Sequence, residues 1–192
     1  MEQLLNFLSS VYPLSEALKD YLVTHLRQRF ILRKEFLLKA GHICKHIYFI
    51  ESGLLRCFYN KDDTDVSSWF MKEGDVIISV ESFFDQKPSY ESIQALEDTL
   101  VHYISFQELE HIYHHFLEFN FVGRILVQNY YKLSEQRLFS MRLQTAVERY
   151  HFLLENFPEL VRRVPTGDIA SYLGVSRETL SRIKKGKRKS IM

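Results

Sequence analysis

The pattern of apolar and polar positions changes twice along this chain of 192 residues. Between about residues 29 and 104, short apolar runs alternate with turn-forming Gly, Asp, Asn and Ser residues at intervals of roughly ten positions. On either side of this region, apolar residues recur at every third or fourth position, which is the period of an amphipathic helix. The pattern therefore predicts helices at both ends and a β-sandwich or barrel between them.

Runs of β-branched and aromatic residues mark the strands of the central region. Residues 47–59 contain two such runs on either side of Glu51-Ser52-Gly53, which predicts two strands joined by a tight turn. The remaining predicted strand segments are 30–38, 66–71, 76–78, 92–96 and 100–104.

Cap residues or a terminating proline locate three of the predicted helices. Residues 14–26 carry apolar side chains at every fourth position, with Ser15 as the expected cap. Ser105-Phe-Gln-Glu108 is a capping box, so a helix should begin there. Residues 145–157 form another helical pattern, which we expect Pro158 to end.

A longer helix is predicted over residues 119–140. Its residues Phe119, Val122, Leu126, Asn129, Leu133 and Gln136 follow a 3-4-3-4-3 spacing. This is the seam of a two-stranded coiled coil, and equally the apolar side of a helix that packs on its own domain. For the dimer interpretation the contact residues are Val122, Leu126, Asn129 and Leu133, with Asn129 favouring a parallel register.

Two short helical patterns meet at a glycine near the C-terminus, between residues 166 and 185. Thr166 is the expected cap of the first helix and Ser176 that of the second. Gly174 stands just after the first helix, where a left-handed backbone conformation is needed and glycine adopts it without steric cost. This spacing predicts a helix-turn-helix.

The second of these helices carries polar residues that a core does not require. Arg177, Glu178, Ser181, Arg182 and Lys185 share one face. Such a face is often simply solvated, but on a helix-turn-helix it fits the DNA major groove, where arginine reads guanine and glutamate can accept from cytosine. The predicted DNA-binding residues are Thr166, Ser176, Arg177, Glu178, Ser181, Arg182, Lys185 and Lys187.

The distribution of charge supports duplex DNA as the partner. Residues 159–192 hold nine Lys or Arg and three Asp or Glu, a balance of +6. The whole chain carries +1, which leaves −5 for residues 1–158. A basic segment on a mildly acidic body is suited to contact phosphates at one end only.

Several other classes of protein are disfavoured by the composition. The two cysteines, Cys44 and Cys57, are too few for a disulfide framework, a zinc site or a four-cysteine iron–sulfur site. The histidine pairs His42/His46 and His111/His115 have no further ligand marked by spacing, so we predict no metal and no cofactor. No apolar run is long enough for a membrane span or secretory signal, and we expect a cytoplasmic protein without membrane contact.

The segment Leu173-Gly-Val-Ser-Arg-Glu-Thr-Leu-Ser-Arg-Ile183 closely resembles the recognition segment of the Crp/Fnr superfamily of bacterial transcription regulators. The resemblance extends over nearly the whole chain through residues 47–56, 73–75 and 95–99, which follow the order of the family. It implies that Arg177, Glu178 and Arg182 read bases and that the long helix forms a dimer. Only residues 159–165 and 186–192 flank the helix-turn-helix, too few for the β-hairpins of many members, so the basic tail is expected to contact phosphates.

The resemblance also implies where a cyclic nucleotide would bind. Members that bind one hold the ribose with a glutamate and the phosphate with an arginine. An ungapped alignment places Ser79 and Ser89 at these positions, and Tyr90 replaces a small residue. Glu81 lies two residues from the ribose position, but residues 75–92 contain no arginine. Since a buried phosphate needs a cationic partner, we expect no control by cyclic AMP, and an effector, if there is one, of unknown chemistry near Ser79, Glu81, Ser89 and Tyr90.

We therefore expect an α+β fold made of a double-stranded β-helix (jelly-roll) sensor domain at residues 1–118, a dimerisation helix at 119–141 and a helix-turn-helix domain at 142–192. The expected function is that of a homodimeric DNA-binding transcription regulator, not an enzyme, with RNA polymerase as a candidate partner. Two alternatives stay open. One is a sensor that acts mainly through protein contacts, and the other is a cupin-type metal-binding protein that would use His42, His46 and His102.

Overall fold

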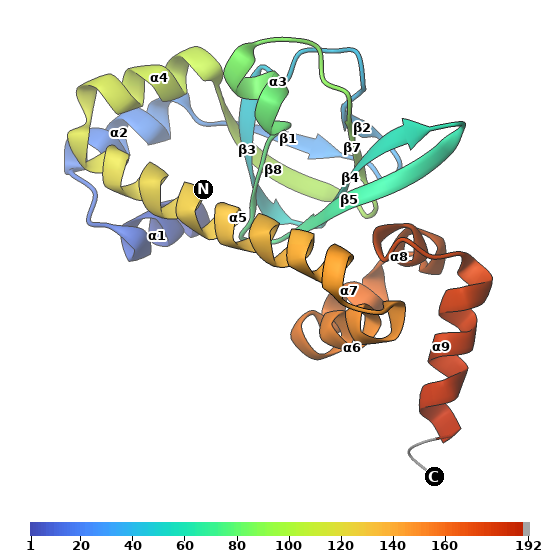
Figure 1. Ribbon diagram of the computed structural model, residues 1–192. Coiled ribbons are helices and arrows are strands. Elements are labelled where there is room, and N and C mark those ends of the chain that lie inside the picture. Colours follow the sequence, from blue (N-terminus) through green and yellow to red (C-terminus); the bar gives the residue numbers. More distant parts are fainter. Residues whose placement is uncertain (190–192) are drawn as a thin grey trace.

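The computed structural model describes residues 1–189, with side chains to residue 186. Its strands form two four-stranded antiparallel sheets, ordered β1-β8-β3-β6 and β2-β7-β4-β5 (Figure 1). The strands are β1 (Arg27–Ile31), β2 (Phe36–Leu38), β3 (His46–Ser52), β4 (Leu54–Lys61), β5 (Thr64–Lys72), β6 (Val76–Ile77), β7 (Ser92–Ala95) and β8 (Thr99–Ser105). The predicted segments 47–59, 66–71, 76–78, 92–96 and 100–104 contain strands as expected, and the α+β class is confirmed. The prediction of a single run over 30–38 is wrong, because a turn at residues 32–35 separates the end of β1 from β2.

The turn between β3 and β4 requires glycine. Gly53 has a φ of +104°, and a Cβ atom there would collide with the backbone of Asp98 and Thr99 in the neighbouring turn. The two predicted strands of residues 47–59 are thus joined where the sequence pattern placed the turn.

Helices surround the two sheets. They are α1 (Glu2–Val11), α2 (Glu16–His25), α3 (Val80–Asp85), α4 (Phe106–His115), α5 (Leu117–Leu143), α6 (Ala146–Asn156), α7 (Pro158–Arg163), α8 (Thr166–Tyr172) and α9 (Arg177–Lys189). Figure 1 shows α1, α2 and α4 together at one end of the sheets, while α5 leads from there to α6–α9 at the other end. In the described part of the chain, no helix combines the length and apolar character needed to cross a lipid bilayer.

The caps predicted at Ser15 and Ser105 are formed, and α6 begins with a cap that was not predicted. The hydroxyl of Ser15 accepts the backbone N–H of Leu18 at the start of α2. Capping boxes begin α4 at Ser105 and α6 at Thr145. Such caps satisfy backbone donors that have no partner within the helix.

Three helices were not predicted. The first, α1, buries Leu4 and Leu8 against the β domain, and α3 is a short helix between β6 and β7. The third, α7, occupies the segment before the helix-turn-helix, which was expected only to be too short for a β-hairpin. Pro158 stands at the first turn of α7, a position where its missing N–H costs nothing, so it ends α6 and begins another helix.

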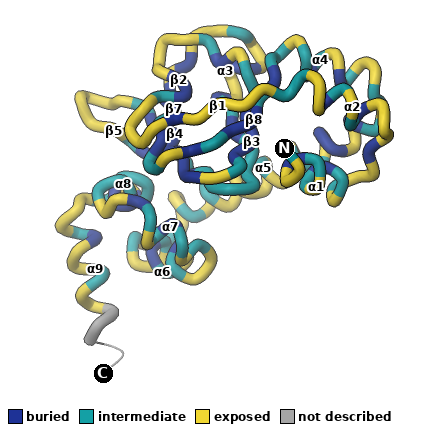
Figure 2. Tube along the Cα trace, turned by 180° about the vertical axis from the view of Figure 1, so that it is seen from behind, coloured by how far each residue is buried: buried dark blue, intermediate teal, exposed yellow. Residues whose placement is uncertain are grey.

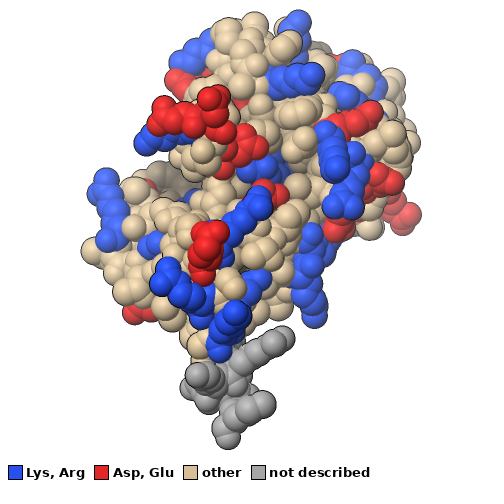
Figure 3. Space-filling model, turned by 90° about the vertical axis from the view of Figure 1, so that its right-hand side faces the viewer, with Lys and Arg blue, Asp and Glu red and all other residues tan. Residues whose placement is uncertain are grey.

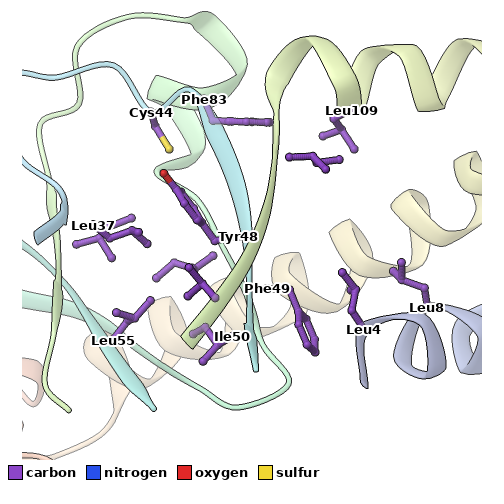
Figure 4. Close-up of a cluster of buried hydrophobic side chains, with 14 of the residues drawn as sticks. Leu4, Leu8, Leu37, Cys44, Tyr48, Phe49, Ile50, Leu55, Phe83 and Leu109 are labelled. Atoms are coloured by element: carbon purple, nitrogen blue, oxygen red, sulfur yellow. The ribbon is translucent and has the colours of Figure 1, made fainter. Parts of the chain in front are cut away.

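The main core lies between the sheets and continues under the helices at one end. Ile31, Ile50, Leu55, Ile93 and Val101 are almost fully buried in it. Figure 4 shows Leu4 and Leu8 beside Phe49 at one side of this cluster. Figure 2 shows the same concentration of buried positions along the strands.

A second, smaller core holds the C-terminal helices. Leu153, Ile169, Leu173 and Leu180 form its centre. Two β residues, Leu54 of β4 and Phe70 of β5, are buried in this same cluster. The sheet region and the C-terminal helices therefore share apolar contacts across the predicted boundary near residue 142.

One arginine of α7 joins the helices to three turns of the β domain, and we call this contact the Arg163 clamp. The guanidinium of Arg163 donates to both carboxylate oxygens of Glu73, at 2.9 and 2.7 Å, and to both of Glu97, at 3.1 and 2.7 Å. It also donates to the carbonyl oxygen of Gly53 at 3.2 Å. Bidentate geometry of this kind gives both strength and direction.

The Arg163 clamp should make the thermal stability of the protein depend on pH under acidic conditions. Hydrogen bonds from Arg163 lower the pKa of Glu73 from 4.5 to about 2. A depressed carboxyl pKa contributes stability that is complete above the unfolded-state pKa and is lost as the pH falls through the folded-state pKa. Between pH 4.5 and about pH 2, the melting temperature of the native chain should therefore fall more steeply than that of Glu73→Gln.

Circular dichroism melts across this pH range provide the measurement. Glu135→Gln, which changes an exposed carboxyl of α5, is the matched control and should keep the native pH profile. Parallel profiles for the native chain and Glu73→Gln would contradict the role of the clamp.

Candidate nucleic-acid interface

The helices α8 and α9 are joined by a turn that closes in a Schellman motif. Gly174 has a φ of +68°, as predicted for the residue after the helix. The N–H of Val175 donates to the carbonyl of Ala170, and that of Gly174 donates to Ser171, both at 3.0 Å. These are the paired bonds by which a left-handed residue ends a helix.

The starts of the two helices differ from each other. Ser176 caps α9 as predicted, with its hydroxyl accepting the N–H of Thr179 at 3.2 Å. The prediction that Thr166 caps α8 is wrong, because the extended residue Pro165 is the cap and Thr166 is already the first helical residue. The hydroxyl of Thr166 lies instead 3.5 Å from the ammonium of Lys184 on α9.

Two arginines that the sequence reasoning missed hold the end of α8. Arg149 donates to the carbonyl of Leu173 through two nitrogens, at 3.1 and 2.9 Å. Arg137 of α5 donates to the carbonyl of Tyr172 at 3.0 Å and lies over the ring of the same residue. Cationic donors stabilise the carbonyl groups that are left without partners at a helix C-terminus.

The first helix of the pair also contacts the β4–β5 hairpin. The hydroxyl of Ser171 donates to the carbonyl of Asp65 at 2.8 Å and accepts the N–H of Ser67 at 2.9 Å. The buried guanidinium of Arg56 lies 3.4 Å from Asp168 and the same distance from Asp65. A cavity of about 660 Å³ lies between hairpin and helices, and Arg177 lines it from the α9 side.

The predicted DNA-binding residues lie on α9, at its N-cap and at the start of α8. Those that are exposed are Thr166, Ser176, Arg177, Glu178, Ser181, Arg182 and Lys185. Lys187 lies outside the residues whose side chains the structure describes. On the face in Figure 3, Lys and Arg side chains collect around the end of the molecule next to the grey C-terminal residues.

The only carboxylate of this predicted set, Glu178, remains ionised. A hydrogen bond with its own backbone N–H and another with Ser176 lower the pKa of Glu178. Because its side chain is exposed, it can act as an acceptor for a base amino group.

The long helix α5 presents two different faces. Val122 is completely buried in the core of its own β domain, and Leu126 packs partly against the same core. The seam proposed for dimerisation is therefore corrected at Val122, whose side chain has no free surface. Asn129 and Leu133 are exposed.

A different set of apolar side chains on α5 faces solvent. Val127, Tyr131 and Leu138 are 58%, 65% and 46% exposed. Their spacing of four and seven residues places them within a narrow arc of the helix, on the side away from Val122. We call these three residues the α5 stripe.

The predicted effector residues are only partly brought together. Ser79 and Ser89 are buried and their hydroxyl groups lie 2.9 Å apart. Glu81 is exposed and pairs with Lys87, and Tyr90 is an exposed side chain, so neither belongs to an enclosed pocket.

A buried carboxylate, Glu91, stands beside these serines and was missed by the sequence reasoning. Its side chain accepts a hydrogen bond from Ser68 at 3.4 Å, and burial raises its pKa. The hydroxyl of Ser89 donates to the carbonyl of Glu91 at 2.7 Å. No sequence motif marked this carboxylate, because its burial follows from the packing of β5 against the segment before β7.

The histidines considered as metal ligands have other contacts in the structure. His102 pairs with Glu51, while His111 and His115 stack on each other with ring centres 3.9 Å apart. In the described residues, no three His, Cys, Asp or Glu side chains form a group that could hold a metal ion.

Comparisons with known proteins find relatives of the β domain and of the overall fold. Residues 28–116 match the family model described as the cyclic nucleotide-binding domain. The curated proteins gave no match to the chain.

Several solved structures share the fold of nearly the whole chain. A CooA mutant from Carboxydothermus hydrogenoformans has a TM-score of 0.71 at 20% identity, covering 92% of this chain and 80% of CooA. FixK2 from Bradyrhizobium japonicum has a TM-score of 0.73 at 21% identity, covering 86% and 85%. A protein from Eubacterium rectale assigned to the crp/fnr family of transcriptional regulators has a TM-score of 0.72 at 16% identity, covering 94% and 88%.

Proposed function

Because this chain has the fold of Crp/Fnr-family regulators, with a cyclic nucleotide-binding domain at residues 28–116, we propose that it is a transcription regulator that binds duplex DNA. The resemblance inferred from the sequence motifs is confirmed at the level of the fold. In the proposed organisation, residues 1–118 form the sensor, 119–141 the dimerisation helix and 142–192 the DNA-binding domain. Such a regulator acts by binding rather than by catalysis, inside the cell, with RNA polymerase as a candidate partner.

The observation that carries the proposal is the free face of α9. Its polar residues are exposed together, while Leu180 and Ile183 on the other side pack into the second core. A helix of 13 residues is roughly 20 Å long, and the major groove is wide enough to admit it. Arginine forks at residues 177 and 182 then supply donors for guanine, and the basic C-terminal segment supplies phosphate contacts.

The proposed unit is a homodimer that uses the α5 stripe. One recognition helix contacts few base pairs, so regulators of this kind gain specificity from two copies in adjacent major grooves. Val127, Tyr131 and Leu138 form an apolar surface on the side of α5 that is not packed against the β domain. Contact between two copies along this surface would remove it from water.

We also propose that cyclic AMP does not control this protein. The position implied for the phosphate-binding arginine is Ser89, which is buried and hydrogen-bonded to Ser79. The nearby buried side chain of Glu91 supplies no positive charge to the phosphate position. Burying a phosphate next to such groups leaves its charge uncompensated.

The DNA-binding proposal is tested by selecting a preferred sequence from a random duplex pool and measuring affinities for it and for unrelated DNA. Arg182→Ala should cost about 1–3 kcal/mol on the selected sequence and relax the preference at one base step, because a base contact is lost. Lys187→Ala should weaken binding to all sequences alike and reduce the salt dependence, as expected of a phosphate contact.

The control for this experiment is Lys19→Ala, which removes an equal charge from α2 at the other end of the molecule and should leave both affinities unchanged. Equal losses on selected and unrelated DNA for Arg182→Ala would exclude Arg182 as a base reader. Failure to select any preferred sequence would contradict the proposed function.

Negative charges introduced into the α5 stripe should dissociate the proposed dimer into monomers. Tyr131→Glu combined with Leu138→Glu places two carboxylates at the seam, where they would be desolvated on association. Sedimentation velocity should give a folded monomer that retains weak binding to unrelated DNA. Gln128→Glu with Glu135→Gln, which keeps the net charge of α5, is the control and should remain a dimer. A native-like dimer in the doubly charged stripe variant would place the interface elsewhere.

Calorimetric titration tests the expected independence from cyclic nucleotides. Neither cyclic AMP nor cyclic GMP should give saturable heat at concentrations up to about 1 mM, which limits any binding free energy to about −4 kcal/mol. The physical reason is that Ser89, which is buried and bonded to the carbonyl of Glu91, offers no cation to the phosphate. Micromolar affinity would show that another cation reaches the phosphate position.

A further inference from the structure

The two sheets leave an opening on one side of the β domain. A cavity of about 340 Å³ lies there, bordered by the edge strands β1 and β2 and by the segment that leads into β3. This volume is at the lower end of the range found for small-molecule sites, roughly 300–1,000 Å³. The cavity is separate from the Ser79–Ser89 pair, because neither serine lines it.

The inner wall of the cavity is apolar. Leu37, Leu38, Cys44 and Tyr48 line it and are buried residues of the main core. In Figure 4, the hydroxyl end of Tyr48 points towards Cys44, and Leu37 lies across from them. Burial raises the pKa of Tyr48 to about 12 and also raises that of Cys44, so both wall residues are neutral at physiological pH.

The rim of the cavity is cationic. Arg29, Lys39 and Lys45 are exposed residues among its lining, and no carboxylate lines it in the described part of the chain. Arg29 lies on the same side of β1 as the buried Ile31, since side chains two residues apart on a strand share a face. Its cationic group is thus on the inner side of the edge strand.

These cations have no carboxylate partner among the described residues, although the ammonium of Lys39 lies over the ring of Phe36. Arg27, two residues before Arg29, forms a salt bridge with Glu108. In the part of the chain that the structure describes, the salt bridges include none to Arg29, Lys39 or Lys45. Inward charges can protect an edge strand from pairing with another chain, but that role does not require two further cations around an apolar cavity.

One wall of the cavity is bonded to the segment around α3. The N–H of Gly41 donates to the carbonyl of Ser89 at 2.7 Å, and the N–H of Ser89 donates to the carbonyl of His42 at 2.9 Å. The N–H of Cys44 donates to the hydroxyl of Ser82 at 2.9 Å. A ligand that moves residues 41–44 would therefore also move the segment that carries the buried serines.

We propose that this cavity binds a small amphipathic organic anion. Its negatively charged head group lies at Arg29, Lys39 and Lys45, and its apolar tail points towards Leu37 and Leu38. An apolar wall with a few convergent polar groups is the usual composition of a small-molecule site, and here the Arg and Lys side chains of the lining are all cationic with no carboxylate among them. This inference concerns the β domain alone and does not depend on DNA binding.

Calorimetric titration with decanoate, below its micelle concentration, tests the proposal on the full chain. Decanoate should bind with one-to-one stoichiometry, whereas decylammonium, with the same tail and the opposite charge, and acetate, with no tail, should not. Equal binding of decanoate and decylammonium would overturn the charge argument, and no saturable heat with decanoate would overturn the proposal.

Charge reversal at the rim provides the matched variants. Arg29→Glu combined with Lys45→Glu should weaken decanoate binding at least tenfold while thermal unfolding stays native-like. Lys61→Glu with Lys72→Glu, which makes the same charge change on the β4–β5 hairpin, should bind decanoate as the native chain does. Loss of affinity in both pairs would indicate only a general charge effect and would overturn the assigned site.

Amide hydrogen exchange locates the ligand independently of affinity. Decanoate should slow exchange at Gly41, Cys44 and Ser89, whose N–H groups connect the cavity wall to the α3 segment. Protection confined to the α5 stripe or to another exposed apolar surface would overturn the assignment to this cavity.

Discussion

The position of the C-terminal helices depends on one guanidinium group. Arg163 reaches the β3–β4, β5–β6 and β7–β8 turns at once, through Gly53, Glu73 and Glu97. Five donors in a rigid plane allow a single arginine to fix both distance and angle between two packed units. Since α7 leads directly into α8, the Arg163 clamp also determines where the candidate DNA-binding helices stand relative to the sheets.

The clamp acts together with apolar contacts of a different character. Leu54 and Phe70 are buried in the core of the C-terminal helices. Their burial stabilises the contact between the two units, but hydrophobic burial does not fix the orientation of the helices. The hydrogen bonds of Ser171 with β5 and the ion pair of Arg56 with Asp168 fix orientation and add little net free energy. The junction thus combines apolar burial with a few directional contacts between the β4–β5 hairpin and α8.

The β domain has its charges arranged unlike those of a cyclic-nucleotide site. Serines and the buried Glu91 occupy the region implied for the phosphate, and the region is closed by their own hydrogen bonds. Arg29, Lys39 and Lys45 instead line a cavity on another side of the same domain, which contains no carboxylate in its described lining. The segment of residues 41–44 contacts both regions, because Gly41 and His42 are hydrogen-bonded to Ser89 and Cys44 lines the cavity.

Features set by neighbouring residues were determined by the sequence alone. The caps at Ser15, Ser105 and Ser176, the turn at Gly174 and most of the strand pattern depend on hydrogen bonds and side-chain periods within a few residues, so local reasoning found them. The cap prediction for Thr166 was wrong because α8 begins one residue earlier than expected, with Pro165 at the cap position and Thr166 inside the helix. The partners of Arg163, 66 and 90 residues away, the burial of Val122 and Glu91, and the cationic cavity were decided only by the tertiary structure. Each requires two distant segments to pack together, and no spacing within one segment specifies which partner it will meet.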